Sequence, residues 1–419
     1  MPCLLVATIA ALIVAFGVPG INAVDRETDV SAAPDVSAAL DVSAAQSALA
    51  SSAVPVLEPV VRDSTQVALD EQRTLSQFGS SWEFDYYVNG AYECGLSGNY
   101  SFMVVNPAGD PDAEAPLWVY LHGGGVGYFD ADGEYVAING QDEHSWNHQE
   151  TFDGLIGIVE EKVLAGNGQL EDQTLVRRIE EGYRVLVVSY CDHDQYSGLG
   201  TPYPNHPMNP AAEVNGLQAT MAAIDYTAAN YPTTHVWVHG TSAGSAGAWA
   251  VGSSYGHEGA ALTGVIVDSS NTGPQKIILG NTLKGTDGFP AGADFDSQGV
   301  TDKIGLFADL DQFVHPEAQV AHRDFRSVPV LFVYGLADPF CGGTLPPIPE
   351  AVAAGSGNCE YLWIDHAAAI DDQAESPHEV HAVPGAGHVP TNDPGPANDL
   401  VDGFIERVLG GDPPNFRAG

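Results

Sequence analysis

Three residues that lie far apart in the chain have the side-chain types needed for nucleophilic hydrolysis: a serine, a histidine and an aspartate. The serine, Ser242, has Gly240 two residues before it and Gly244 two residues after it. A serine hydroxyl becomes a nucleophile when a base takes its proton and N–H donors receive the charge on the substrate oxygen. The flanking glycines permit the tight strand-to-helix turn that exposes such a serine. This spacing predicts that Ser242 is the nucleophile.

The same Gly-x-Ser-x-Gly pattern occurs a second time, around Ser254. In a chain with 47 glycines among 419 residues the pattern has little weight by itself. The second copy follows Ala-Trp-Ala-Val, which lacks the character of a strand, so the required strand–turn–helix context is missing. We therefore predict that Ser254 lies inside or at the end of a helix and has no catalytic role.

A glycine-rich segment, His-Gly-Gly-Gly at 122–125, directly follows the apolar run 117–121. Without Cβ atoms, backbone N–H groups can approach a substrate oxygen closely. We expect the N–H groups of Gly124, Gly125 and Ala243 to form an oxyanion hole.

A base and an acid follow two later apolar runs. His388 comes after the run 379–383, in a loop rich in glycine, and Asp338 comes after the run 328–334. A serine, then an acid, then a histidine in chain order fits a triad in which the acid orients the imidazole. We predict His388 as the base and Asp338 as the acid, with Asp268, one strand earlier, as the alternative acid.

Seven apolar runs alternate with segments of helical length, which predicts an α/β domain with a mostly parallel sheet. Near-continuous apolar character is typical of strands that are covered on both faces. A helix is expected to begin at Asn209-Pro210, and a closing helix is expected over 399–409. The predicted strands are 101–105, 117–121, 184–190, 235–239, 263–267, 328–334 and 379–383.

Two long segments, near 130–180 and 272–326, interrupt this alternation. Insertions of that length commonly build a cap over a site. Tyr128 and Phe129, just before the first segment, either line a substrate pocket or are buried under the cap.

The combination of serine turn, His-Gly-Gly-Gly loop, acid and histidine resembles the α/β-hydrolase superfamily over about residues 100–410. The resemblance implies an α/β-hydrolase fold, with a mostly parallel central sheet flanked by helices. It also implies a serine esterase in which Ser242, Asp338 and His388 are catalytic.

A finer resemblance concerns the segment 189–198, Ser-Tyr-Cys-Asp-His-Asp-Gln-Tyr-Ser-Gly. Together with the Ser-Ala-Gly of the serine turn, it is similar to the pectin acetylesterase/Notum-type carboxylesterases. Those enzymes usually have more cysteines and commonly continue Gly-Gly where this chain has Gly244-Ser245. This similarity implies carboxylester hydrolysis.

The chain is expected to have four parts. Residues 1–23, with an apolar run at 3–18, are typical of a signal peptide, with a membrane anchor as the alternative. Residues 24–65 contain Asp-Val-Ser-Ala-Ala three times and are expected to be a linker or a pro-segment. The catalytic domain is predicted over 66–412, followed by a tail at 413–419. We therefore expect a secreted protein.

The formal net charge is −41, from 55 acidic and 14 basic residues. Such a chain repels phosphate backbones and anionic lipids, so we expect neither a nucleic-acid partner nor a membrane partner after export. The charge also disfavours polygalacturonate, which leaves neutral esters as expected substrates. We expect no cofactor and no metal, because Asp130-Ala-Asp132-Gly-Glu134 lacks the spacing of a calcium loop. The sequence indicates no oligomeric state.

Four cysteines remain after the predicted signal peptide, and an even number in an exported chain predicts two disulfides. Three pairings are possible. The short loop between them favours Cys341–Cys359, which leaves Cys94 to pair with Cys191.

The preferred hypothesis is a secreted serine carboxylester hydrolase that forms an acyl-enzyme intermediate. A serine peptidase on the same fold is one alternative. The other is a binding protein that has kept only the hydrolase scaffold, against which the complete set of Ser, Asp, His and glycine loop argues.

Overall fold

The computed structural model describes a large part of the chain after residue 58, and the predicted signal peptide, most of the linker, the cap at 272–326 and the tail lie outside the described residues. The described residues are 59–77, 80–106, 110–124, 127–129, 132–137, 148–164, 174–203, 205–258, 262–269, 328–338, 352, 355, 357–360, 378–392 and 395–411.

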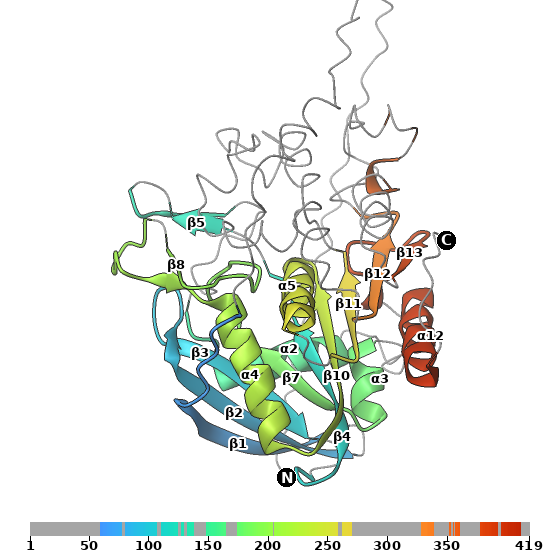
Figure 1. The fold of residues 1–419 in the computed structure, drawn as a ribbon, viewed down its shortest axis with the longest axis horizontal. Coiled ribbons are helices and arrows are strands. Elements are labelled where there is room, and N and C mark those ends of the chain that lie inside the picture. Colours follow the sequence, from blue (N-terminus) through green and yellow to red (C-terminus); the bar gives the residue numbers. More distant parts are fainter. Residues whose placement is uncertain are drawn as a thin grey trace, which may run out of the picture. The chain divides into compact units, whose positions relative to one another are not determined.

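A nine-stranded sheet in the order β1-β2-β3-β7-β4-β10-β11-β12-β13 forms the centre of the described fold (Figure 1). The six strands from β7 to β13 are parallel, and β1, β2 and β3 pair antiparallel. The predicted α/β architecture, a mostly parallel sheet flanked by helices, is confirmed. The strands are β1 Val67–Gln77, β2 Ser80–Glu93, β3 Asn99–Asn106, β4 Ala115–Leu121, β7 Arg184–Val188, β10 Thr233–Thr241, β11 Gly264–Asp268, β12 Val330–Gly335 and β13 His378–Val383.

The strand order indicates at which edge of the sheet a ligand site is expected. After β4 the chain adds β7 on one side of it and then β10 on the other side. In open parallel sheets, ligands bind outside the carboxyl ends of strands at such a reversal. The loops that follow β4, β7 and β10 therefore meet at the expected position of a site.

Helices cover both faces of the sheet, which explains the continuous apolar runs of its strands. Leu117 and Val119 pack with the helices α4 (Gly216–Asn230) and α5 (Ala243–His257) on one face. Trp118 and Tyr120 point to the other face. That face is covered by α2 (Phe152–Leu164), α3 (Thr174–Glu180) and α12 (Pro396–Gly410).

The chain before the predicted domain boundary already packs on this fold. The backbone N–H of Val60 donates to the carboxylate of Glu258, and Arg62 forms ion pairs with Asp225 and Glu258. Strands β1 and β2 follow and were not predicted from the sequence. In β1 the residues from Ala68 to Gln72 are exposed, so polar residues interrupt its apolar pattern.

The predicted helix start at Asn209 is wrong, because α4 begins at Gly216 with Asn215 as its N-cap. The side chain of Asn209 accepts a hydrogen bond from the N–H of Ala211 and so stabilises a turn. The buried carboxylate of Asp194 accepts the N–H of Gly216, which fixes the start of the helix at that residue.

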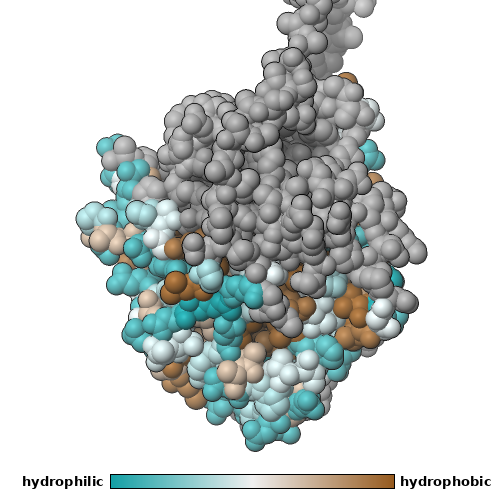
Figure 2. All heavy atoms as spheres, in the orientation of Figure 1, coloured by the Kyte–Doolittle hydropathy of each residue, from teal (hydrophilic) through white to brown (hydrophobic). Residues whose placement is uncertain are grey.

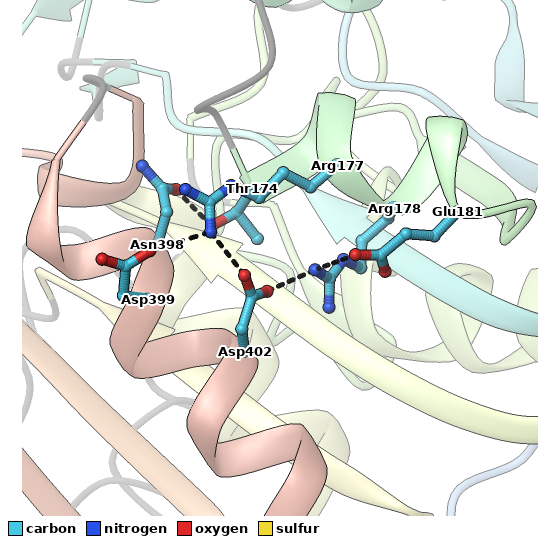
Figure 3. Close-up of polar contacts among 7 residues, drawn as sticks. All are labelled: Thr174, Arg177, Arg178, Glu181, Asn398, Asp399 and Asp402. Atoms are coloured by element: carbon cyan, nitrogen blue, oxygen red, sulfur yellow. Dashed lines mark hydrogen bonds and ion pairs between the residues drawn. The ribbon is translucent and has the colours of Figure 1, made fainter.

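The end of the first predicted cap segment belongs to the layer that covers the sheet. Apolar residues of α2 and α3 are buried against the sheet, so residues 152–164 and 174–180 of that segment do not belong to a cap over the site. Figure 3 shows how α3 and α12 are joined: Arg177 and Arg178 both form ion pairs with Asp402, and Thr174 donates to Asn398.

On the face shown in Figure 2, hydrophilic residues dominate the described surface, with hydrophobic atoms in smaller groups among them. The large hydrophobic side chains that are exposed are separated in the sequence: Val61, Leu69, Met208, Val352 and Leu409. No helix in the described part of the chain is long and apolar enough to cross a membrane.

Candidate active site

Ser242 lies at the sharp turn between β10 and α5, as the sequence predicts. Its φ of 53° and ψ of −118° are unusual for a residue with a side chain. A Cβ on Gly240 would lie 1.9 Å from the carbonyl oxygen of Gly244, and one on Gly244 would lie 2.0 Å from that of Leu121. Both positions therefore require glycine, and the turn presents the serine at the carboxyl edge of the sheet.

Ser242, His388 and Asp338 form a continuous hydrogen-bonded set. Nε2 of His388 lies 2.7 Å from Oγ of Ser242, and Nδ1 of His388 lies 2.8 Å from Oδ2 of Asp338. The Asp338 side chain is fully buried, whereas a quarter of the His388 side chain is exposed. The carboxylate can accept only from a protonated Nδ1, which leaves Nε2 free to accept the serine proton.

The alternative acid, Asp268, makes different contacts. Its carboxylate accepts hydrogen bonds from Ser269 and from both the N–H and the hydroxyl of Thr391. Burial raises the pKa of Asp268 to about 6. The carboxylate of Asp268 thus accepts hydrogen bonds from Thr391 and Ser269, whereas the carboxylate that contacts Nδ1 of the imidazole is that of Asp338.

The His-Gly-Gly loop after β4 runs directly against the serine turn. Leu121 pairs with Gly240 in the sheet, and the N–H of Gly123 donates to Oγ1 of Thr241 at 3.1 Å. A Cβ on Gly123 would lie 2.9 Å from the Cβ of Ser242. The absence of a side chain thus permits the contact between this loop and the nucleophile.

The side chain of His122 fixes the next peptide of this loop. Nδ1 of His122 donates to the carbonyl oxygen of Gly123 at 2.8 Å. Because a trans peptide is planar, the N–H of Gly124 points opposite to that carbonyl, away from the imidazole. On the other side of the ring, Nε2 lies 3.4 Å from the buried carboxylate of Glu150. These contacts orient a backbone N–H that the sequence assigns to the oxyanion hole.

Aromatic side chains of the loop after β7 support the same glycines. The ring of Tyr190 occupies the space that a Cβ on Gly124 would need, at 2.8 Å. This ring stacks on those of His193 and Tyr196, with centroid distances of 5.2 and 4.7 Å. The disulfide between Cys94 and Cys191 attaches this loop to the end of β2.

The same loop contains two buried carboxylates that are held by backbone N–H groups. Asp194 accepts from Tyr196, Gly198 and Gly216, and Asp192 accepts from Gly95 and Asn215. Burial, with the charge of Asp194 beside it, raises the pKa of Asp192 to about 7, and burial raises the pKa of Asp194 to about 6. The loop is therefore rigidly anchored by groups that have no part in the hydrogen-bonded Ser–His–Asp set.

The remaining predicted residues divide into three groups. Cys94–Cys191 is confirmed as a disulfide; Cys359 is also disulfide-bonded, but Cys341 lies outside the described residues, so this second pairing stays a prediction. Phe129 is buried against Tyr203 and His206, in agreement with the burial alternative. Gly125 and the side chain of Tyr128 lie outside the described part.

Ser254 lies within α5, where its Oγ donates to the carbonyl oxygen of Ala250 at 2.8 Å. The prediction that the second Gly-x-Ser-x-Gly copy is helical is confirmed. Sequence reasoning missed Glu150, in a loop, and Thr391, in the short 3₁₀ helix at 390–392, because neither belongs to a motif. Within the described residues, no group of three His, Cys, Asp or Glu side chains is placed to hold a metal ion.

No family model matches the chain, and no curated protein matches it. Among solved structures, the chain is similar to an S-formylglutathione hydrolase from Agrobacterium tumefaciens, with 10% identity, 80% of this chain and 98% of that chain covered, and a TM-score of 0.44. It is also similar to Est1E from Butyrivibrio proteoclasticus (16% identity, 81% and 98% covered, TM-score 0.36). An esterase from Pyrococcus furiosus has 13% identity, with 80% and 91% covered and a TM-score of 0.41.

Proposed function

We propose that the protein is a secreted serine carboxylester hydrolase that acts on neutral esters through an acyl-enzyme intermediate. The observation that carries the proposal is the chain of two contacts, 2.7 Å from Ser242 to His388 and 2.8 Å from His388 to Asp338. A serine presented on a strained turn, with a base and an acid in line, is the arrangement that activates a hydroxyl group.

In the first step, His388 takes the proton of Ser242 as Oγ attacks the ester carbonyl carbon. The buried carboxylate of Asp338 stabilises the imidazolium that forms. The N–H groups of Gly124, Gly125 and Ala243 receive the oxyanion. His388 then returns the proton to the leaving alcohol, which departs as the acyl-enzyme forms.

In the second step, His388 takes a proton from water, and the resulting hydroxide attacks the acyl carbon. Collapse of the second tetrahedral intermediate releases the carboxylic acid and returns the proton to Ser242. Two observations support the finer parts of the proposal. The disulfide between Cys94 and Cys191 fits an oxidising compartment, and the net charge of −41 favours neutral substrates.

The test compares Ser242→Ala with Ser254→Ala, since the two serines share a motif, whereas Ser242 precedes α5 and Ser254 lies within it. We expect Ser242→Ala to lower hydrolysis of p-nitrophenyl acetate by about 10⁴-fold or more and to abolish labelling by a fluorophosphonate. Ser254→Ala should retain both. Full activity of Ser242→Ala would overturn the assignment, and cleavage of amides without cleavage of esters would establish a peptidase instead.

A further inference from the structure

Asp268 connects the two loops that carry the nucleophile and the base. It is the last residue of β11, between β10 and β12, and its side chain is fully buried. Its backbone carbonyl oxygen accepts the N–H of Ser242 at 3.0 Å. The backbone of Asp268 therefore holds the serine turn, and its carboxylate is available for other hydrogen bonds.

That carboxylate holds the loop of the base. Thr391 follows His388 by three residues, in the short 3₁₀ helix η6 (Pro390–Asn392). Both its N–H, at 3.2 Å, and its hydroxyl donate to Oδ2 of Asp268. A carboxylate that accepts two hydrogen bonds from one residue restricts both the backbone and the side chain of that residue. The position of the imidazole thus depends on a carboxylate that does not touch it.

The carboxylate also contributes charge. Its titratable neighbours are His388, Tyr334 on β12 and, through the hydroxyl of Thr391, His239 on β10. Attraction to the protonated imidazole of His388 opposes the rise that burial causes in the pKa of Asp268. At pH 8 the carboxylate is ionised, because that pKa lies at about 6. A buried negative charge then favours the imidazolium that forms during catalysis.

We propose that Asp268 is a positioning residue for ester hydrolysis: it fastens the loop of His388 to the turn of Ser242 and supplies a second negative charge near the imidazole. This inference rests on the proposed function. In this inference Asp338 contacts the imidazole directly. Asp268 acts on the imidazole indirectly, through its hydrogen bonds with Thr391 and through its negative charge.

The variants are Asp268→Asn, Thr391→Val and Thr391→Ser, tested with p-nitrophenyl acetate between pH 5 and 9. For Asp268→Asn we expect kcat/KM at pH 8 to fall by about 10- to 100-fold, because the imidazole is misplaced. The acid limb of its profile should move to lower pH by about 0.5 unit or more, because a charge that favours the imidazolium is gone. Thr391→Val should lose about 10-fold, and Thr391→Ser, which keeps the hydroxyl, should stay within about 3-fold of wild type.

The matched control is Asp85→Asn, the same substitution at a carboxylate that is also buried but lies on β2, with three strands between β2 and β10. It should lower stability and leave the acid limb unchanged. Circular dichroism corrects each rate for the folded fraction. If Asp268→Asn fails to fold, the difference in kcat/KM between Thr391→Val and Thr391→Ser tests the positioning role instead.

Two outcomes separate the inference from the proposed function. If a fluorophosphonate labels Ser242 in the wild type, and Asp268→Asn keeps the rate and the pH profile of the wild type, the positioning role is wrong and the hydrolase remains. Equal activity of Thr391→Val and Thr391→Ser would also overturn the role. If the wild type is neither labelled nor active, the proposed function itself fails, and the inference fails with it.

Discussion

Buried carboxylates have different partners at the two edges of the parallel sheet. Near the amino ends of the strands the buried carboxylate of Glu379, the second residue of β13, is bound by Arg407. At the carboxyl ends, Asp268 and Asp194 accept hydrogen bonds only from hydroxyl and backbone N–H groups in the contacts described above. The first kind of partner neutralises a charge, whereas the second kind leaves it in place.

The difference is visible in the pKa values. Burial raises the pKa of Glu379, but hydrogen bonds from His381 and Arg407 outweigh it, and the value is lowered overall. Burial dominates at the carboxyl edge, where the pKa of Asp268 is raised to about 6. A cation at that edge would repel the imidazolium that His388 must become. The comparison therefore teaches that, among the described residues, an arginine such as Arg407 stabilises the fold at a position away from the Ser–His–Asp set.

The largest effect is expected from a variant that damages the amino edge alone, Arg184→Met. Arg184, the first residue of β7, is fully buried and donates to Asn106 and to the carbonyl oxygens of Pro111, Ala113 and Pro232. Leaving these acceptors unsatisfied should cost about 4 kcal/mol in the free energy of unfolding, measured in urea.

The activity of the same variant sharpens the comparison. The opposite end of β7 lies about 13 Å away, at about 3.3 Å per residue, so the loop after it should be unaffected. We expect kcat/KM of the folded Arg184→Met protein to stay within about 2-fold of wild type. A loss of activity beyond the unfolded fraction would show that the two edges are not independent.

The next effect concerns pH. The raised pKa values of Asp192, at about 7, and of Asp194 and Asp268, at about 6, lie above the value of about 3.9 for an unfolded aspartate. Between these limits the native state binds more protons than the unfolded state. The free energy of unfolding should therefore fall as the pH rises from 4.5 to 5.5, by about 3 kcal/mol.

Repulsion among surface carboxylates acts in the same direction, so the titration is repeated in 0.5 M NaCl, which screens surface charges but not buried ones. Asp192→Asn should flatten the remaining slope. A free energy of unfolding that rises over this interval would contradict the view that the carboxyl edge holds uncompensated charges.

The strands of the sheet also differ in how well the sequence predicted them. All seven predicted strands are present, because buried parallel strands have uninterrupted apolar runs. Ser242, Asp338 and His388 could be predicted because each follows such a strand. The strands β1 and β2 were missed, since polar residues interrupt the apolar pattern of β1.

Contacts between loops gave no signal in the sequence. Thr391 and Glu150 belong to no motif, and their partners lie 123 and 28 positions away. Asn209 and Asn215 are equally good caps by residue type, and the choice between them depends on the buried carboxylate of Asp194. Local pattern thus predicted the seven buried strands and the positions of Ser242, Asp338 and His388, whereas tertiary hydrogen bonds determine where α4 begins and what supports the site.

A smaller effect is expected for Arg407→Gln, which removes the cation from Glu379. Since the native pKa of Glu379 is lowered, its contribution to stability is present above the unfolded value of about 4.3 and is lost as the pH falls through the native value. The variant should lose about 1 kcal/mol at pH 7, because Arg407 is partly exposed, and almost nothing near pH 3. An equal loss at both pH values would show that Arg407 contributes by packing instead of by charge.

The smallest effect is expected for Arg177→Gln, at the junction of α3 and α12 in Figure 3. Arg177 pairs with Asp399, whose side chain is 76% exposed, and shares Asp402 with Arg178. Solvent screens such pairs, so the variant should lose about 0.5 kcal/mol or less in the free energy of unfolding, measured in urea.

Arg178→Gln is the matched comparison, because that side chain is buried and lies over the ring of Trp118. It should lose about 2 kcal/mol, since a buried guanidinium with its ion pair and a packed aliphatic stem are removed together. If both variants lost the same amount, burial would not determine what an arginine contributes at this edge of the sheet.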